Sequence, residues 1–414
     1  MAAPESINID DLRARARARL PRVVFDYLDG GAEDEATLRA NRAAFGRYAF
    51  VPRVLAGHRS VRLSTTLLGD AVAVPWVVGP TGLNGIFRRD ADLALARAAA
   101  HEGAVYAHAM AANVTLEAAA AAAGPLRWFQ FYPWGPPEAW ARVIARASGA
   151  GYRALVLTVD SLVPGNRERD RRHGFSHRLR IAPRTVLDGL AHPRWLADVW
   201  LRGGTPRMEN LAPLLRSGAS GAELADYARR ERHPEFSWEH VVRVRDLWRG
   251  PMLVKGILHP DDASRAAAIG ADGVVVSNHG GRQLDGAIAT LDALPDIVRA
   301  AGRDTTILVD GGFRRGGDIV KALALGANAV ILGRAPLYGV AADGERGVRR
   351  ALEILREETL RALALLGCPD TCALDSSYLR RVAWSDDTGG TAGRTHGQSR
   401  SRAGAPASTG PADG

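Results

Sequence analysis

A histidine and an arginine stand three residues apart in the segment 277–285, which reads SNHGGRQLD. The segment directly follows the apolar run 273–276, which predicts a buried parallel strand. His279 and Arg282 are therefore expected on a glycine-rich loop at the carboxyl end of that strand. Taken alone, such a histidine is more commonly an ordinary loop residue. Together the two side chains offer a general base and a cation for a substrate that carries a carboxylate.

Eight apolar runs alternate with helical stretches, which predicts a (β/α)8 TIM barrel of the α/β class with its chemistry at the carboxyl ends of the strands. A doubly wound sheet is the alternative. It is disfavoured because candidate site residues follow nearly all of the runs, as a closed ring of strands requires. The expected strands are 73–79, 105–110, 128–132, 154–160, 252–255, 273–277, 306–310 and 329–332.

The 414 residues can form such a barrel as one domain, which we expect at 1–384. The spacing of apolar residues between 10 and 28 predicts N-terminal helices that pack on the barrel. The connection at about 171–235, after the fourth strand, is long enough to be a separate insert. From 385 to 414 the composition turns to small and polar residues, which predicts a disordered tail.

The net charge of +9 comes almost entirely from arginine. A basic chain can bind nucleic acid, an anionic membrane surface or an anionic substrate. Nucleic acid is not expected because no helix-turn-helix, zinc or RNA-binding motif is visible. Of the two lysines, Lys255 ends a predicted strand, whereas Lys321 lies within a predicted helix and is expected to be exposed. Cys368 and Cys372 predict simple thiols and no metal site.

Two glycine-rich turns with arginines follow the seventh and eighth predicted strands, at 310–316 and 332–334. Barrels commonly bind a phosphate at this place, through backbone N–H groups and cations. The chain contains no run of about twenty apolar residues, so no membrane-spanning helix is expected. No leader segment is visible at the start, which predicts a cytoplasmic protein.

The whole segment 277–285 resembles the signature of the FMN-dependent 2-hydroxy acid dehydrogenases and oxidases, and the resemblance extends from about Ile9 to Leu379. Segment 25–35 resembles the family's N-terminal block, and segments 79–85 and 366–370, with the long insert, are most similar to the (S)-mandelate dehydrogenase branch. This resemblance implies that the chain oxidises an (S)-2-hydroxy acid, an aryl one such as mandelate, to the 2-oxo acid. L-lactate or another aliphatic acid is the alternative substrate. A non-catalytic flavin-binding module is the alternative of another class.

The resemblance also implies roles for individual residues. His279 would be the base, oriented by Asp160, and the substrate would be held by Tyr27, Tyr132, Arg167 and Arg282. Lys255 has a rationale of its own, because an ammonium beside the flavin stabilises the negative charge of the reduced ring. The remaining FMN contacts would be Pro80, Thr81, Gly82, Ala109, Gln130, Tyr132, Thr158 and Ser277, with Asp310, Gly311, Gly312, Phe313, Arg314, Gly333 and Arg334 at the phosphate.

Two positions depart from the usual family pattern. Ala109 replaces a serine, so only its backbone can contact the flavin. Gly82 stands where the oxidases commonly carry alanine, which favours a dehydrogenase that passes electrons to a membrane quinone over an oxidase. Gly82 and Ala111, both small, would leave room for an aromatic substituent.

The insert holds aromatic and aliphatic residues among arginines, a composition typical of a membrane-surface segment. A lid or a subunit contact is equally consistent with that composition. Segments 186–189 and 192–195 resemble the membrane-associating insert of the mandelate-oxidising branch. The resemblance therefore implies peripheral binding to the inner face of the cytoplasmic membrane, and a homotetramer.

Overall fold

The computed structural model describes residues 5–58, 60–174 and 183–382. One compact unit extends over Met1–Val382. The predicted tail at 385–414 lies outside the described residues, as does the part of the insert at 175–182.

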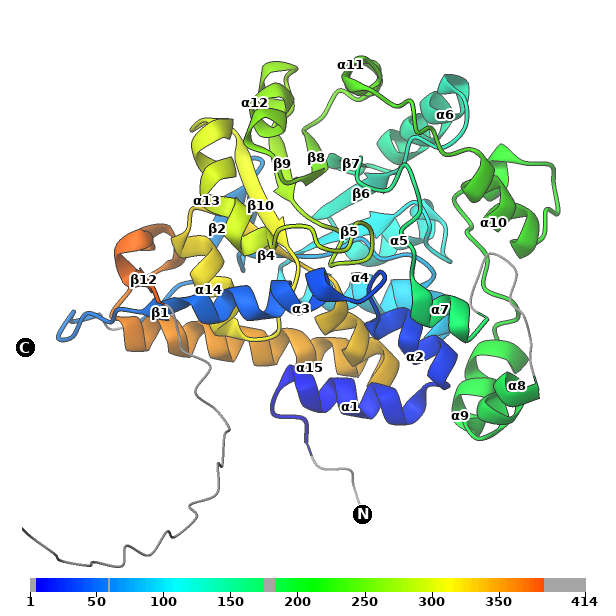
Figure 1. Cartoon of the computed structure of the whole chain (residues 1–414), viewed down its shortest axis with the longest axis horizontal. Coiled ribbons are helices and arrows are strands. Elements are labelled where there is room, and N and C mark those ends of the chain that lie inside the picture. The colour runs from blue at the N-terminus through cyan, green and yellow to red at the C-terminus, as the bar shows by residue number, and fades with distance from the viewer. Residues whose placement is uncertain (1–4, 59, 175–182, 383–414) are drawn as a thin grey trace, which may run out of the picture. The chain divides into compact units, whose positions relative to one another are not determined.

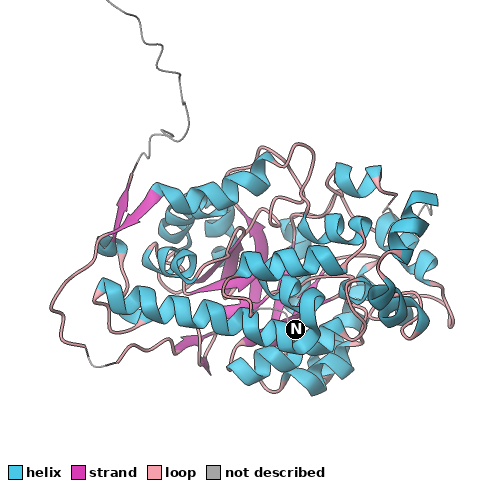
Figure 2. Cartoon of the chain, turned by 90° about the horizontal axis from the view of Figure 1, so that it is seen from below, coloured by secondary structure: helices cyan, strands magenta, loops and turns pink. Residues whose placement is uncertain are grey.

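Eight parallel strands close into a barrel in the order β10-β11-β4-β5-β6-β7-β8-β9, which confirms the predicted fold class. Figure 2 shows the strands at the centre of a surrounding set of helices. Each strand is almost wholly buried, which explains the continuous apolar runs in the sequence. The strands are β4 (Trp76–Val78), β5 (Val105–Ala109), β6 (Arg127–Phe131), β7 (Ala154–Thr158), β8 (Met252–Ile257), β9 (Gly273–Val276), β10 (Thr306–Asp310) and β11 (Ala329–Leu332).

Side chains from alternating strand positions fill the interior of the barrel. Val77, Trp128, Val156, Leu253 and Leu308 are buried together there. The interior is therefore a packed core, and the space for a ligand must lie above it at the ends of the strands.

The helices that follow the strands bury one face against the barrel. In α6, for example, Val143, Ile144 and Ala147 are buried, and their spacing is that of one helix face. The helices of this layer are α4 (Ala91–Glu102), α5 (Leu116–Ala123), α6 (Pro137–Gly149), α11 (Trp238–Leu247), α12 (Pro260–Ala268), α13 (Thr290–Ala301), α14 (Gly316–Ala324) and α15 (Arg334–Leu366).

Three helices precede the barrel: α1 (Ile9–Arg19) and α2 (Arg22–Asp29), in the region where helices were predicted, and α3 (Ala36–Ala43), which was not predicted. Helix α1 packs along α15, which Figure 1 shows in the lower part of the molecule. Two small antiparallel pairs complete the fold, β1 (Tyr48–Phe50) with β12 (Leu379–Arg381) and β2 (Thr65–Leu67) with β3 (Asp70–Val72).

The insert forms short helices between β7 and β8, at the right of Figure 1. Trp195 and Val199 are buried, and Trp195 Nε1 donates to the Ile86 carbonyl oxygen at 2.7 Å. Leu187 and Leu201 are 67% and 79% exposed, so the apolar residues divide between an inner and an outer face. The elements are α7 (Glu168–Arg172), α8 (Pro183–Leu190), α9 (Pro193–Leu196), the π-helical turn η3 (Ala197–Leu201) and α10 (Gly221–Arg230).

One sequence-based expectation is wrong. Lys321 is half-buried on α14, where its Nζ donates to the Phe45 carbonyl oxygen at 2.7 Å and lies over the Phe50 ring. Cys368 and Cys372 are free thiols, and no group of potential metal ligands occurs among the described residues.

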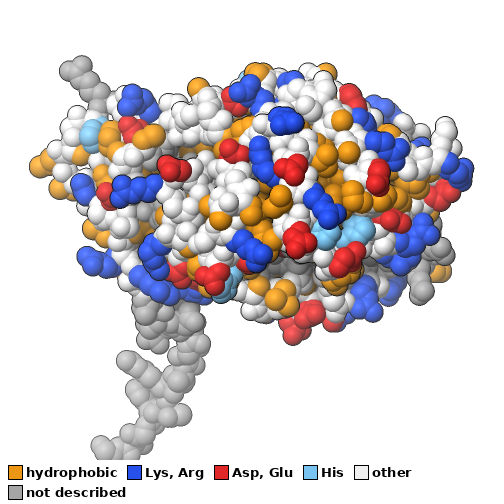
Figure 3. Space-filling model, turned by 90° about the horizontal axis from the view of Figure 1, so that it is seen from above, with side chains coloured by type: hydrophobic (Ala, Val, Ile, Leu, Met, Phe, Trp, Pro, Cys, Tyr) orange, Lys and Arg blue, Asp and Glu red, His pale blue; other side chains and the backbone are white. Residues whose placement is uncertain are grey.

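On the face seen in Figure 3, basic and acidic side chains are interspersed, with no single continuous basic patch. Within the described ranges, no helix is both long enough and apolar enough to cross a membrane.

Candidate active site

A cavity of about 1040 Å³ opens at the carboxyl ends of the barrel strands and continues beneath the insert. Nearly every residue predicted for the site lines it. The three exceptions, Thr158, Asp160 and Ser277, each hydrogen-bond to a residue that does line it. The lining residues from the prediction are Tyr27, Pro80, Thr81, Gly82, Ala109, Gln130, Tyr132, Arg167, Lys255, His279, Arg282, Asp310, Gly311, Gly312, Phe313, Arg314, Gly333 and Arg334.

His279 lies on the loop after β9 in a left-handed backbone conformation, with φ of 56°. A non-glycine residue there is strained, and such strain concentrates at functional sites. Its Nδ1 lies 2.8 Å from Asp160 Oδ1. Burial opposes ionisation of Asp160, but the charges of His279 and Lys255 lower its pKa. An ionised Asp160 accepts the Nδ1 proton of His279, which leaves Nε2 as the basic atom of the neutral imidazole.

The His279 loop is fixed by the N-terminal helices. The side-chain amides of Asn278 and Asn41 donate to each other at 2.8 Å. The carbonyl oxygen of Gly281 accepts from Ala32 N, and a Cβ at Gly281 would lie 2.6 Å from Leu38 N. Glycine at 281 is therefore required by close backbone approach as well as by its positive φ of 74°.

Two arginines flank the ring of Tyr27. The guanidinium carbon of Arg282 lies 5.0 Å from the ring centroid, and that of Arg167 lies 5.7 Å away. Arg282 Nη1 donates to the carbonyl oxygens of Tyr27 and Gly30, both at 2.9 Å. Burial and then the neighbouring Arg167 charge lower the pKa of Arg282. A carboxylate placed between the two guanidinium groups would relieve this repulsion.

Tyr132, which follows β6, stacks on Trp134 with ring centroids 4.5 Å apart and an interplanar angle of 7°. Burial and then the charge of Asp160 raise the pKa of Tyr132. Its hydroxyl therefore stays protonated at neutral pH and can donate a hydrogen bond into the cavity.

Lys255 is buried at the end of β8. Its Nζ donates to Ser277 Oγ at 2.7 Å and lies 3.0 Å from Asp310 Oδ2. Burial opposes its charge, but the carboxylates of Asp310 and Asp160 raise the pKa of Lys255. The second oxygen of Asp310, Oδ1, is buried without a hydrogen-bond partner among the described residues.

Two arginines line the end of the cavity that follows β10 and β11: Arg314 is buried and Arg334 is partly buried. Burial and then the positive charge of Arg282 lower the pKa of Arg334 to about 9, and Arg314 acts in the same direction. No carboxylate lies within ion-pair distance of Arg334 or Arg314 in the described part of the chain. A Cβ at Gly333 would meet no atom within 4 Å, so the backbone beside these cations borders open space. This end fits a phosphate, and the unpartnered Asp310 Oδ1 fits a ribityl hydroxyl, as FMN requires.

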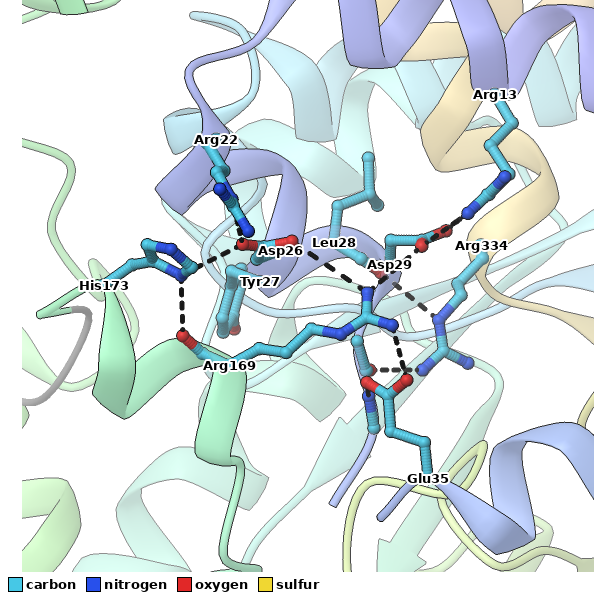
Figure 4. Close-up of polar contacts among 12 residues, drawn as sticks. Arg13, Arg22, Asp26, Tyr27, Leu28, Asp29, Glu35, Arg169, His173 and Arg334 are labelled. Carbon is cyan, nitrogen blue, oxygen red and sulfur yellow. Dashed lines mark hydrogen bonds and ion pairs between the residues drawn. The ribbon is translucent and has the colours of Figure 1, made fainter. Parts of the chain in front are cut away.

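The C-terminal end of α2 lies between Arg334 and Arg169 (Figure 4). Arg334 donates to the carbonyl oxygens of Leu28 and Gly30, at 3.2 and 2.8 Å. Arg169, on α7, lies beside three carboxylates of the N-terminal region: Glu35 Oε2 at 2.5 Å, Asp29 Oδ2 at 3.5 Å and Asp26 Oδ1 at 3.9 Å. The end of α2 that carries Tyr27 is therefore held by Arg334 through backbone carbonyl oxygens and by Arg169 through carboxylates.

The remaining predicted cofactor residues are small or hydrogen-bonded. Gln130 Nε2 donates to Thr158 Oγ1 at 3.0 Å. Gly82 packs directly on Ala111, because a Cβ at Gly82 would lie 2.9 Å from Ala111 Cβ. The carbonyl oxygen of Ala109 accepts from Asn210 of the insert at 3.4 Å.

Sequence reasoning missed several residues of the cavity wall. Gln283 lay within the recognised segment, and its side chain donates to the carbonyl oxygens of Asp160 and Val163. For the residues of the insert, the only sequence signal was its apolar composition, which was consistent with a lid, and the remaining residues lie on loops near the insert. Apart from Gln283, the missed residues are Trp134, Ser161, Asp170, Trp195, Val199, Trp200, Met208, Ala225 and Arg232.

Comparisons with known proteins agree with this geometry. The chain is 44% identical to (S)-mandelate dehydrogenase of Pseudomonas putida over 90% of its length and 93% of that protein. It is 40% identical to L-lactate dehydrogenase of Pseudomonas syringae pv. syringae (strain B728a), over 89% and 97%. A crystal structure of the monotopic membrane protein (S)-mandelate dehydrogenase superposes with a TM-score of 0.88 at 43% identity, covering 92% of this chain and all of that one. The family model for FMN-dependent dehydrogenases matches residues 16–381, so the chain belongs to this family and FMN is its cofactor.

Proposed function

We propose that this enzyme oxidises an (S)-2-hydroxy acid with an aryl substituent, such as mandelate, to the 2-oxo acid. The observation that carries the proposal is the hydrogen bond between His279 and Asp160. Beside this pair lie Arg282 and Arg167, whose positive charges repel each other and would be balanced by a substrate carboxylate. A binding protein needs the cations but has no use for an oriented base. The named relatives act on mandelate and on L-lactate, so both belong to this substrate class.

In the proposed reaction, Arg282 and Arg167 hold the substrate carboxylate, and the hydroxyls of Tyr27 and Tyr132 complete its orientation. Nε2 of His279 accepts a proton from the substrate. Asp160 keeps the other proton on Nδ1 and stabilises the imidazolium that results. FMN, when bound, would accept the two electrons and the second proton that the substrate loses.

We assign the cofactor contacts from the chemistry of each group. Lys255 would compensate negative charge on the flavin, and Arg314 and Arg334 with the glycine-rich turns would hold the phosphate. The Asp310 carboxylate forms an ion pair with Lys255 and would repel a phosphate. We therefore assign Asp310 to a ribityl hydroxyl and not to the phosphate. The remaining cofactor residues are assigned to contacts with the flavin ring: Pro80, Thr81, Gly82, Ala109, Gln130, Thr158 and Ser277.

The part of the cavity under the insert supports an aryl substituent. Trp195, Val199, Trp200 and Met208 give this part an apolar wall larger than a methyl group needs. L-lactate remains the second candidate, because it would use the same carboxylate site and leave this wall uncontacted.

We further propose that the enzyme binds peripherally to the inner face of the cytoplasmic membrane through its insert and delivers electrons to a membrane quinone. Support comes from the exposed Leu187, Leu190 and Leu201, with Arg184 and Arg194 exposed beside them. The structural neighbour described as monotopic agrees with this arrangement. A homotetramer is the proposed assembly.

Anaerobic bleaching of the bound flavin tests the proposed reaction. (S)-Mandelate should reduce the flavin faster than L-lactate does, and a quinone analogue should reoxidise it faster than air. A flavin that neither acid reduces would contradict the proposal and leave a non-catalytic flavin-binding module as the alternative.

A further inference from the structure

One cation of the cavity wall has no role in the reaction proposed above. Arg232 follows α10 at the end of the insert and lines the cavity. Its Nη1 donates to the Ser161 carbonyl oxygen at 2.8 Å, and its Nε to the Ala228 carbonyl oxygen at 3.3 Å. Its guanidinium carbon lies 5.8 Å from the Trp134 ring centroid. All of these partners are neutral.

The positive charge of Arg232 is therefore unmatched. No carboxylate lies within ion-pair distance of it in the described ranges, whereas Arg167 has Asp170 at 3.6 Å. Burial lowers the pKa of Arg232; Tyr132 raises it and Arg167 lowers it further. A largely buried cation without an anion is costly unless a ligand supplies the counter-charge.

The position of Arg232 indicates which part of a ligand could reach it. The barrel side of the cavity holds the groups assigned to FMN and to the substrate carboxylate. Arg232 enters the cavity from the end of the insert, over the Trp134 ring, and the small Ala225 and Ala228 line the same cavity. This is the side left for the substituent on the α-carbon of the substrate.

We propose that Arg232 forms a subsite for a second anionic group, carried on the substituent of the substrate. This subsite rests on the proposed function, and it predicts that the preferred substrates are 2-hydroxy acids with a carboxylated aryl substituent. Two of the five N–H groups of Arg232 are used by carbonyl oxygens, so three are available to a carboxylate, which a guanidinium binds in a bidentate manner.

A merely structural role makes a different prediction. If Arg232 only braces Trp134, and through it the stacked Tyr132, its loss should affect every substrate to the same degree. Substrate discrimination therefore separates the two roles.

The test compares Arg232→Met with Arg229→Met, using (S)-mandelate and (S)-4-carboxymandelate. Arg229 borders the same cavity but is paired with Asp226 at 3.6 Å and has a half-exposed side chain, so it is a control for the loss of one positive charge. The wild type should prefer the carboxylated acid in kcat/KM. Arg232→Met should lower kcat/KM for that acid by about 10- to 100-fold, the loss expected for a hydrogen bond between charged groups. In Arg232→Met, kcat/KM for mandelate should change by less than about threefold. In Arg229→Met, kcat/KM for both acids should also change by less than about threefold.

Equilibrium binding gives a readout without turnover. Phenylacetate and 4-carboxyphenylacetate lack the hydroxyl, and their binding can be followed by the absorbance change of the flavin. Arg232→Met should weaken the binding of 4-carboxyphenylacetate and leave the binding of phenylacetate unchanged. Equal losses for both compounds, or a wild type without preference, would overturn the subsite. Failure of both hydroxy acids to reduce the flavin would overturn the proposed reaction instead, and the two analogues would then decide the subsite on their own.

Discussion

Replacing Arg169 should weaken substrate binding even though this side chain is not assigned to contact the substrate. Arg169 stands two residues after Arg167, and its guanidinium group joins α7 to the carboxylates of Asp26, Asp29 and Glu35 (Figure 4). Arg169→Gln removes this attachment. Arg167 should then spend less time beside Tyr27, and the apparent affinity for a carboxylate should fall in proportion.

The magnitude follows from the distances and the exposure. Two unit charges about 4 Å apart attract by about 1 kcal/mol in water and about 4 kcal/mol at an effective dielectric constant of about 20. The Arg169 side chain is 38% exposed, so solvent screening reduces the sum of its contacts to about 1–2 kcal/mol. Since about 1.4 kcal/mol corresponds to tenfold in affinity, we expect KM to rise about 5- to 30-fold. The turnover number kcat should change by less than about threefold, because His279 and Asp160 are untouched.

Steady-state kinetics and the binding of phenylacetate measure this effect. Arg172→Gln is the matched control, because Arg172 is on the same helix and is 71% exposed, with Glu168 as its only ion-pair partner among the described residues. Arg169→Lys should recover part of the affinity. In a double-mutant cycle, Glu35→Gln should add little to Arg169→Gln. An unchanged KM, or an equal fall in kcat, would refute the reasoning.

Three further predictions concern stability, the flavin and the membrane. Burial opposes ionisation of Asp29, but hydrogen bonds from Arg13 and Tyr338 lower the pKa of Asp29 to about 2. The ionised Asp29 therefore stabilises the fold above about pH 4, and this stabilisation is lost as the pH falls through about 2. Asp29→Asn should therefore lower the free energy of unfolding by about 1–2 kcal/mol at pH 6, and a difference from wild type that does not shrink between pH 4 and 2 in urea titrations would contradict this. Lys255→Met should lower the midpoint potential of the bound flavin in a spectroelectrochemical titration, and an unchanged potential would exclude the assigned role. Replacing Leu187, Leu190 and Leu201 by serine should reduce co-sedimentation with phosphatidylglycerol vesicles, whereas Leu365→Ser, at a residue 72% exposed on α15, should not.

The barrel was predictable because its strands are buried on both faces and therefore appear as continuous apolar runs. The loop at 277–285 was predictable because the order of residues after one strand places its base and cation together. Both features depend on residues that are close in sequence.

The positions of Arg169 and Arg232 were not predictable in the same way. Arg169 meets a carboxylate 134 residues earlier in the chain, and Arg232 meets a carbonyl oxygen 71 residues earlier. Such contacts depend on how the insert packs, which local spacing does not encode. Lys321 was misjudged because its partner Phe45 lies 276 residues away, beyond the reach of local spacing.

The proposed reaction depends on His279 as the base, oriented by Asp160, in a site that otherwise binds flavin and substrate. The most direct measurement is the rate of anaerobic flavin reduction by (S)-mandelate in His279→Ala, with flavin content and phenylacetate affinity measured in the same preparation. We expect the variant to retain its flavin, to keep its phenylacetate affinity within about tenfold, and to reduce flavin more slowly by about 10²–10⁴-fold. A reduction rate close to that of the wild type would contradict this role of His279.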